Sequence, residues 1–545
     1  MEYGNVLGMM KGLYNQPNVS HLSPSETRKE AEKYGFKTKF DNYNFVSVVK
    51  NRSAGLTVYL GPQELRQEKL SPKQQEILNG VPRTLSLLGE YLKKAPLVCV
   101  ERTMGMNPGF TPKCTLYVSV HRRDSARLPY MVGQTLFDPQ PSGGSAPELF
   151  MVYIPEWQEK DRQILAFPEE GVTFVLGSDY YGEAKKGFLR MAMWHAKKQG
   201  MLGLHAGAKI INAKGRDGRV KKFGMLIFGL TATGKTTHSC HNHGLTEMGE
   251  GVEIVQDDFV IWRPDGSAWG TEKGFYVKTE GLALDTQPLL YKAATAKDAI
   301  LENVMVDYAG NIYFDDETLT GNGRCIIQRD DLRPYLSEVP NLPPAAELER
   351  LIIAFITRRN TIVPIASRLS PEEAAAAFML GESIESTGSD PKKAGESVRE
   401  VGTNPFIVGS EAQEGNRFYE FVKRHPGKIA CYLLNTGGVG EVIERLPDGK
   451  KTVKQKVDRV QINEMASIIR GIVRDSIEWG EDQYWKSTVP VKVEGADMSR
   501  FDLTKFYPKG EIDKQIKNLL GERIEWLERF PGLEKDVKES VGRPV

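Results

Sequence analysis

The chain has 545 residues, with 72 Lys and Arg against 71 Asp and Glu, so its formal net charge at pH 7 is +1. This length favours two domains, or one large α/β body with insertions. The balanced charge argues against broad electrostatic binding of nucleic acid or of an anionic membrane. We therefore expect small-molecule ligands, with no nucleic acid and no membrane among the partners.

The first residues, the apolar runs and the cysteines of the sequence predict in which cellular compartment the protein lies. The first residues lack a basic start followed by an apolar core, and the sequence has no run of about 18 apolar residues that could span a bilayer. The five cysteines are odd in number and lack Cys-x-x-Cys spacing. We expect a soluble, cytoplasmic protein with reduced, mostly buried thiols.

Helical and strand patterns alternate through the first two hundred residues. The first fifty residues are polar, and we expect them to wrap the surface with one helix at 25–34. The further predicted elements are helices at 71–78, 84–92 and 187–198 and strands at 97–100, 116–120, 149–153 and 173–176. This alternation is typical of an α/β layer structure.

The second part of the chain begins near residue 200, where we place a domain boundary. A hairpin-like turn at 215–218 precedes an apolar strand at 224–228. Residues 383–403 are polar, lack apolar periodicity and are long for a connection, as lids often are. Residues 512–527 place their apolar side chains on one helical face, which predicts core packing or, alternatively, an oligomer contact.

Residues 229–237 read Gly-Leu-Thr-Ala-Thr-Gly-Lys-Thr-Thr, a phosphate loop directly after the strand at 224–228. In such a loop the backbone N–H groups wrap the phosphates, which the glycines at 229 and 234 permit. Lys235 would reach the β/γ oxygens, and Thr236 would offer its hydroxyl to Mg²⁺. The motif predicts a user of nucleotide triphosphates.

A pair of aspartates, Asp257 and Asp258, closes a second apolar stretch at 253–256. A neighbouring strand would deliver such a carboxylate to the same metal ion as the phosphate loop. His238, Cys240, His241 and His243 crowd together just after the loop, but residues this close on a helix project around it and match no standard zinc spacing. We expect no physiological zinc site there.

Several other polar residues admit two interpretations each. The segment Tyr-Tyr-Gly-Glu-Ala-Lys-Lys-Gly at 180–187 could gather polar groups at the carboxyl end of a strand, or could carry two solvated lysines. His205 lies among apolar and small residues, where a histidine is more often a satisfied core residue than a metal ligand. Arg324 follows a turn, and Arg324 and Arg52 could each bind an anion or point to solvent.

Taken in order, these pieces resemble the ATP-type phosphoenolpyruvate carboxykinase family over nearly the whole chain. The matching segments are Asn51-Arg52-Ser53, Leu70-Ser71-Pro72, Gly105-Met106-Asn107-Pro108, residues 180–186, His205, residues 229–237, Asp257-Asp258, Tyr276-Val277-Lys278-Thr279, residues 320–324, Asn404-Pro405-Phe406 and Asn435-Thr436-Gly437-Gly438. The resemblance implies an α/β, two-domain fold. A substrate-binding domain would span residues 1–202, and a phosphate-loop nucleotide- and metal-binding domain would span 203–545 with a mobile lid at 383–403.

The resemblance also implies the reaction, which is oxaloacetate plus ATP giving phosphoenolpyruvate, CO₂ and ADP, reversibly. It implies Mn²⁺ and Mg²⁺ as cofactors beside ATP/ADP. The implied catalytic residues are Arg52, Tyr180, Lys186, Lys235 and Arg324, and the implied metal ligands are Lys186, His205, Thr236 and Asp258. The implied nucleotide-binding residues are Gly229, Leu230, Thr231, Ala232, Thr233, Gly234, Lys235, Thr236, Thr237, Lys278 and Arg324.

The sequence departs from the family at a few positions, so two alternatives stay open. Ala232 stands where the family usually has glycine, so this backbone position must avoid a positive φ. The sequence Phe-Val-Ile-Trp at 259–262 replaces a polar family segment. The chain could instead be a related phosphate-loop kinase acting on a protein or small-molecule hydroxyl, or a nucleotide-binding regulatory protein without turnover.

Overall fold

The computed structural model describes residues 5–65, 70–107, 109–140, 146–158, 162–230, 233–384, 396–445 and 451–541. The chain forms two compact units, each built from discontinuous segments. Unit 1 consists of Met1–Gly203, Gly270–Pro334 and Phe406–Ser410, and unit 2 consists of Leu204–Trp269, Tyr335–Pro405 and Glu411–Val545. The expected domains at 1–202 and 203–545 stay a prediction.

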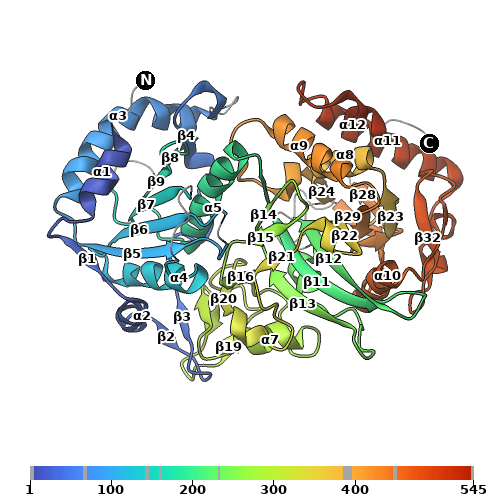
Figure 1. Ribbon diagram of the computed structural model, residues 1–545, viewed down its shortest axis with the longest axis horizontal. Helices are drawn as coiled ribbons and strands as arrows, with labels where there is room; N and C mark the ends of the chain where they lie inside the picture. The colour runs from blue at the N-terminus through green and yellow to red at the C-terminus, as the bar shows by residue number, and fades with distance from the viewer. Residues whose placement is uncertain are drawn as a thin grey trace. The chain divides into compact units, whose positions relative to one another are not determined.

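Unit 1 is built around a seven-stranded mixed sheet with helices on both faces (Figure 1). In spatial order its strands are β1 (Val19–His21), β5 (Leu97–Thr103), β6 (Lys113–Ser119), β7 (Glu148–Ile154), β9 (Val172–Leu176), β8 (Gln163–Phe167) and β4 (Thr57–Tyr59). Its helices are α1 (Val6–Leu13), α2 (Pro24–Glu32), α3 (Pro72–Leu92), α4 (Arg127–Thr135), α5 (Tyr181–Lys198) and α7 (Pro288–Ala294).

Alternation along β7 shows how the two faces of this sheet are filled. Phe150 and Val152 pack into the core that α1 and α3 complete. Met151, between them in sequence, reaches the opposite face and meets α5 at Gly187. Because successive side chains of a strand point to opposite faces, the continuous apolar run of β7 buries both. Unit 1 also holds a second sheet, in the order β16 (Gly274–Lys278), β20 (Arg324–Gln328), β17 (Ile300–Glu302), β3 (Tyr43–Phe45) and β2 (Phe36–Lys37).

Unit 2 contains a six-stranded sheet that carries the phosphate-loop strand near its centre. In spatial order its strands are β13 (Gly251–Gln256), β11 (Ala206–Lys214), β12 (Val220–Gly229), β22 (Arg350–Thr357), β26 (Ile429–Asn435) and β23 (Ala366–Leu369). The helices are α6 (Lys235–Cys240), α8 (Pro371–Leu380), α9 (Glu411–Arg424), α10 (Ile462–Arg474), α11 (Lys509–Leu527) and α12 (Lys535–Ser540). Strands β12, β22 and β26 run parallel.

Two separate cores cover this sheet. On one face, Phe228 stacks with Phe355 and meets Phe378 of α8 and Phe418 of α9 edge-on. On the other face, Ile227 packs in the cluster that includes residues of α10 and α11. The rigid sheet between these cores therefore fixes the carboxyl ends of β12, β22 and β26, where an open α/β sheet binds its ligands.

The α/β class is confirmed, and most predicted elements coincide with observed ones. The two predicted helices at 71–78 and 84–92 are wrong in one respect, because they form a single helix, α3, which contains Pro82. Burial of Ile77, Val81, Leu85 and Leu88 along one face outweighs the local cost of the proline. The first fifty residues do more than wrap the surface, since α1 buries Val6, Met10 and Leu13 in the core of unit 1.

Three further expectations can be compared with the structure. Ile512, Ile516 and Leu519 of α11 lie in the core of unit 2, which confirms core packing of that face. All five cysteines are buried and free, as predicted. In the part of the chain that the structure describes, no helix combines the length and apolar character needed to cross a membrane.

The ends of the predicted lid at 383–403 form a short antiparallel pair, in which β24 (Glu382–Ile384) bonds with β25 (Ser397–Arg399). Residues 385–395 lie outside the described residues, so the lid stays a prediction. At the base of the pair, Glu382 forms ion pairs with Arg359 at 2.9 Å, Arg399 at 3.0 Å and Arg523 of α11 at 2.6 Å. Burial alone would raise the pKa of Glu382, but the guanidinium groups hold it well below its ordinary value.

The substitution Glu382→Gln is expected to lower the free energy of unfolding by about 3 to 5 kcal/mol, because it leaves buried guanidinium groups without their carboxylate. The folded pKa lies below the unfolded one, so this contribution is fully present above the unfolded pKa and is lost as the pH falls toward the folded pKa. Urea unfolding followed by tryptophan fluorescence at several pH values measures it. The exposed Glu347→Gln is the control, and equal unfolding midpoints for the two variants would contradict the prediction.

Candidate active site

The phosphate loop joins β12 to α6 in unit 2. Gly234 precedes the helix with a φ of +98°, a conformation that side chains with a Cβ rarely adopt. Thr233 closes the turn by donating its hydroxyl to the carbonyl of Leu230 at 2.7 Å. Thr231 and Ala232 lie outside the described residues, so the expectation about φ at Ala232 stays a prediction.

Thr436, directly after β26, forms a hydrogen bond to the phosphate loop. The hydroxyl of Thr436 lies 2.6 Å from the carbonyl oxygen of Thr233 and 3.1 Å from that of Thr357, at the end of β22. The loop after β12 is thus bonded to Thr436 at the end of β26, and the same hydroxyl also reaches the end of β22. Thr436 lies within a segment whose sequence resembles the family, but the sequence did not predict this contact.

Three of the predicted site residues of unit 2 meet at one carboxylate oxygen. Asp258 Oδ1 lies 2.7 Å from Lys235 Nζ and 2.8 Å from His205 Nε2. The other ring nitrogen of His205 bonds to the carbonyl of Thr403. Lys235 comes from the phosphate-loop helix, His205 from the start of β11 and Asp258 from the end of β13. The imidazole of His205 and the ammonium of Lys235 therefore both lie within hydrogen-bonding distance of one carboxylate oxygen of Asp258.

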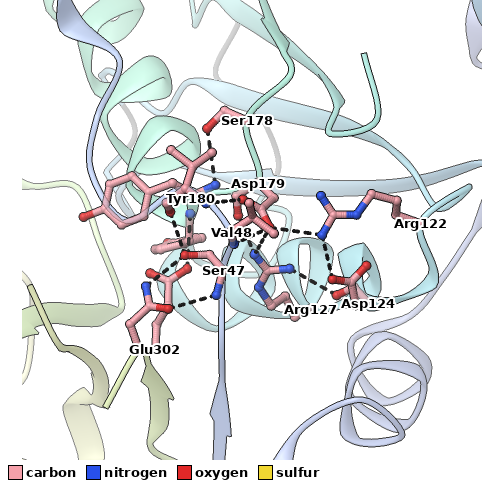
Figure 2. A network of polar contacts seen from close by, with 12 residues as sticks. Ser47, Val48, Arg122, Asp124, Arg127, Ser178, Asp179, Tyr180 and Glu302 are labelled. Carbon is pink, nitrogen blue, oxygen red and sulfur yellow. Dashed lines mark hydrogen bonds and ion pairs between the residues drawn. The ribbon is translucent and has the colours of Figure 1, made fainter. Parts of the chain in front are cut away.

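Unit 1 holds the other predicted residues, beginning with Tyr180 at the turn from β9 to α5. The preceding residue, Asp179, is 1 % exposed, and its two carboxylate oxygens each accept a backbone N–H, from Val48 and Val49, at 2.9 Å (Figure 2). The guanidinium of Arg127 lies 3.2 Å from the same carboxylate. Burial raises the pKa of Asp179, but Arg127 and the two N–H groups more than offset this and lower it. Asp179 thus ties the segment before Arg52 to the start of α5.

Arg52 lies three residues after Val49 in the same segment. The backbone of the next residue is also bonded to α5, since the N–H of Ser53 donates to Glu183 at 2.5 Å. The guanidinium of Arg52 lies over the ring of Phe406 at 4.1 Å, and Lys186 Nζ lies over the same ring at 4.7 Å. Within the described chain, Arg52 forms no hydrogen bond or ion pair, and its Nε is buried without a partner. A half-buried cation of this kind is suited to an anionic ligand.

Lys185 and Lys186, at the start of α5, have different surroundings, so the interpretation as two solvated lysines is wrong. Lys185 is buried and forms an ion pair with Glu272 at 2.8 Å, with both side chains only 1 % exposed. Lys186 is half-buried beside Phe406. One lysine therefore stabilises the fold, and the other lies beside Arg52.

Arg324 and Tyr180 are joined by a residue that sequence reasoning passed over. Asn322 Oδ1 accepts from Arg324 at 2.7 and 3.1 Å, and its amide nitrogen donates to Tyr180 Oη at 3.2 Å and to the carbonyl of Lys50 at 2.8 Å. Lys278 lies directly opposite Arg324 in the pairing of β16 with β20, and Lys278 bonds to Glu280. The only sequence signal for Asn322 was its place in the turn at 320–324.

The described residues include no group of three or more His, Cys, Asp and Glu side chains placed to hold one metal ion, and the absence of zinc at His238, Cys240, His241 and His243 stays a prediction. The ammonium of Lys209 occupies the position next to His243 Nε2. Burial, followed by the charge of Lys209, lowers the pKa of His238 to about 3. These imidazoles are therefore neutral and packed inside unit 2.

The chain is similar in sequence to known proteins. A family model described as phosphoenolpyruvate carboxykinase matches residues 78–499, a range that contains every predicted site residue except Arg52. A protein of Aeropyrum pernix named phosphoenolpyruvate carboxykinase (ATP) is 31 % identical over 452 residues, which cover 82 % of this chain and 83 % of that protein. Proteins of the same name from Rhizobium leguminosarum bv. trifolii and Nitrobacter hamburgensis are 27 % and 26 % identical, over 71 % of this chain and 68 % and 69 % of their own lengths.

Proposed function

Because this chain belongs to the phosphoenolpyruvate carboxykinase (ATP) family, we propose how its two groups of residues share the reaction of that family. The enzyme converts oxaloacetate and ATP to phosphoenolpyruvate, CO₂ and ADP and uses a divalent metal ion. The comparisons do not favour the two alternatives, a generic phosphate-loop kinase or a regulatory protein without turnover.

The chemistry requires fixed positive charge. Loss of CO₂ from oxaloacetate leaves an enolate, whose oxygen then attacks the γ-phosphorus of ATP. Negative charge collects first on the enolate and then on the transferring phosphoryl group, so preorganised cations should supply most of the transition-state stabilisation. Arg52, Lys186, Lys235, Lys278 and Arg324 are the cations assigned to this task.

The nucleotide binds at the phosphate loop of unit 2. The backbone of residues 229–234 surrounds the phosphates, and Lys235 holds the β/γ oxygens from the first turn of α6. The bonds from Thr436 and Thr233 support the assignment, because they hold the loop at the end of β26.

The donor set around Asp258 fits a divalent ion such as Mn²⁺. A carboxylate oxygen and an imidazole nitrogen are suitable ligands, and the bond from the second ring nitrogen of His205 to Thr403 is typical of a ligating histidine. We assign His205, Asp258 and Lys186 to Mn²⁺ and Thr236 to Mg²⁺. When bound, these ions neutralise charge on the enolate and phosphate oxygens. The observation that carries the assignment is that His205 and Lys235 share Asp258 Oδ1.

The substrate carboxylate is held by Arg52. Its guanidinium forms no hydrogen bond or ion pair in the described chain and lies on Phe406 beside Lys186. Tyr180 lines the pocket from which CO₂ departs. Asn322 bonds to both Tyr180 and Arg324. It therefore holds Tyr180, near the departing CO₂, in a fixed position relative to Arg324, which neutralises the γ-phosphate. Lys278 acts beside Arg324 on the neighbouring strand.

The variants His205→Asn and Lys186→Met test the metal assignment. Each should raise the Mn²⁺ concentration needed for half-maximal turnover and lower the maximal rate, because each removes one ligand, while ATP binding stays nearly unchanged. Manganese titrations of carboxykinase activity, with ATP binding by calorimetry, measure both effects. The controls are the exposed His121→Asn and Lys198→Met, the latter on the same helix α5 as Lys186. Titration curves that coincide with those of the parent would remove both residues from the metal site.

A further inference from the structure

Lys209 of β11 is a fully buried lysine to which the reaction assigns no role. It is 0 % exposed and lies on the same face of β11 as Ile211 and Ala213, which belong to the apolar core of unit 2. The pairing of β11 with β13 shifts register between Ala208 and Lys209. A bulge of this kind re-aims the side chain at the site where it occurs.

The ammonium of Lys209 contacts the end of the phosphate-loop helix. It donates to the backbone carbonyl of His238 and to Nε2 of His243, and the carbonyl of His241 lies 3.4 Å away. The last carbonyls of a helix have no partner within the helix, and those of α6 end at Cys240. The three donors of the ammonium therefore meet three acceptors that the helix end and the following turn leave open.

No carboxylate of the described chain pairs with this ammonium. Its charge is instead balanced by the carbonyl end of α6, where the helix dipole favours a cation. Burial lowers the pKa of Lys209 to about 7. Burial, and then the charge of Lys209, lowers the pKa of His243 well below its ordinary value, so this imidazole is neutral and accepts through Nε2.

The turn after α6 is fixed through the same residue. His243 has a φ of +56°, its N–H donates to His241 Nδ1 at 2.8 Å, and its carbonyl accepts from Arg470 of α10 at 3.1 Å. At the other side of the contact, α6 lies so close to β11 that a Cβ at Gly207 would come within 2.1 Å of Ser239 Oγ. The helix is therefore clamped between β11 and α10.

His238, whose carbonyl accepts from Lys209, is only three positions after Lys235 of the phosphate loop. Lys235 and Thr236 open α6, and His238 is already in its last turn. At 1.5 Å per residue the whole helix is about 9 Å long, so a shift at its carbonyl end moves the groups that face the phosphates. We propose that Lys209 is a positioning residue for nucleotide binding, which holds α6 and the phosphate loop by donating to the carbonyl of His238 and to His243.

This inference rests on the proposed role of the phosphate loop, and the variant Lys209→Met tests it in the full-length chain. Methionine matches the shape of lysine without its charge or donors. The dissociation constant of Mg·ATP, measured by calorimetry, should rise about tenfold or more, the scale expected for loss of a hydrogen bond that involves a charged group. The KM for ATP should rise with it, whereas the KM for oxaloacetate stays within about twofold.

Thermal unfolding of the same variant separates positioning from general stability. Replacing a buried charge by an apolar side chain of similar volume often leaves stability unchanged or increases it, so we expect a melting temperature at or above that of the parent together with weaker ATP binding. The matched control is Lys222→Met, an exposed lysine on the neighbouring strand β12. A folded Lys209→Met variant with the ATP affinity of the parent overturns the inference.

A second variant covers the case in which Lys209→Met does not fold. His243→Gly takes the left-handed backbone without strain and removes the side-chain acceptor for Lys209, and its Mg·ATP dissociation constant should rise severalfold. An unchanged affinity there overturns the inference as well. Failure of the proposed function can be told apart from failure of this inference. The proposed function fails if the parent makes no oxaloacetate, whereas the inference fails if the variants keep the ATP affinity of the parent.

Discussion

Lys235→Ala is expected to reduce carboxykinase turnover by a factor of about 10³ or more, the scale for removing a main cation from the transition state. Lys235 opens α6 and lies 2.7 Å from Asp258 Oδ1, so it connects the phosphate loop to the assigned metal ligands. During transfer, negative charge spreads over the equatorial oxygens of the γ-phosphoryl group. Lys235 is the single lysine in the sequence of residues 229–237, so no second ammonium of this segment can replace it. The measurement is kcat and kcat/KM with saturating Mn²⁺.

The control for this variant is Lys492→Ala, which removes an exposed lysine from β32 (Thr488–Lys492) of the same unit. It should keep the turnover of the parent. Near-normal turnover of Lys235→Ala would show that residues 229–237 do not act on the transferring phosphate, and the assignment of the nucleotide site would then fail.

Arg52→Gln is expected to cost about 2 to 5 kcal/mol of substrate binding or transition-state stabilisation, the range for leaving a buried charge without its partner. Use of oxaloacetate and phosphoenolpyruvate should fall sharply, while ATP affinity changes little. The structural reason is that the guanidinium of Arg52 forms no hydrogen bond or ion pair in the described chain, whereas Asp179 and Glu183 hold the backbone on either side of it, at Val49 and Ser53. Steady-state kinetics for both substrates, beside ATP calorimetry, measure the effect.

The matched control is Arg219→Gln, whose side chain is 82 % exposed in the turn before β12. Unchanged kinetics of Arg52→Gln with oxaloacetate would exclude Arg52 from substrate binding. An equal loss of ATP binding would instead indicate a folding defect, and the milder Arg52→Lys would then replace it. Arg52 also lies outside the residues that the family model matches, so this variant tests the assignment where that model does not reach.

The sequence was informative where chemistry is local. A phosphate loop needs its residues in one short run, so the motif at 229–237 predicted the strand and helix that the structure shows as β12 and α6. Apolar runs likewise predicted β5, β6, β7 and β9 of the seven-stranded sheet and β12 of unit 2, because a buried strand is recognisable from its own residues.

Contacts between distant segments were out of reach. Asn322 bonds to Tyr180, 142 residues away in the chain, and Phe406 lies under Arg52 and Lys186 only because the short segment Phe406–Ser410 packs with unit 1. A turn asparagine and a loop phenylalanine give no local signal of such roles. The continuous helix α3 was missed for a similar reason, since burial of its apolar face in the tertiary structure outweighs the local helix-breaking effect of Pro82.

The most direct test of the account is fixation of labelled bicarbonate by the pure protein with phosphoenolpyruvate, ADP and Mn²⁺. The account predicts labelled oxaloacetate and ATP in equal amounts, with no label fixed when ADP or phosphoenolpyruvate is left out. Binding of ADP without any labelled oxaloacetate, under conditions where the protein is folded, would contradict the assignment of carboxykinase activity to this chain.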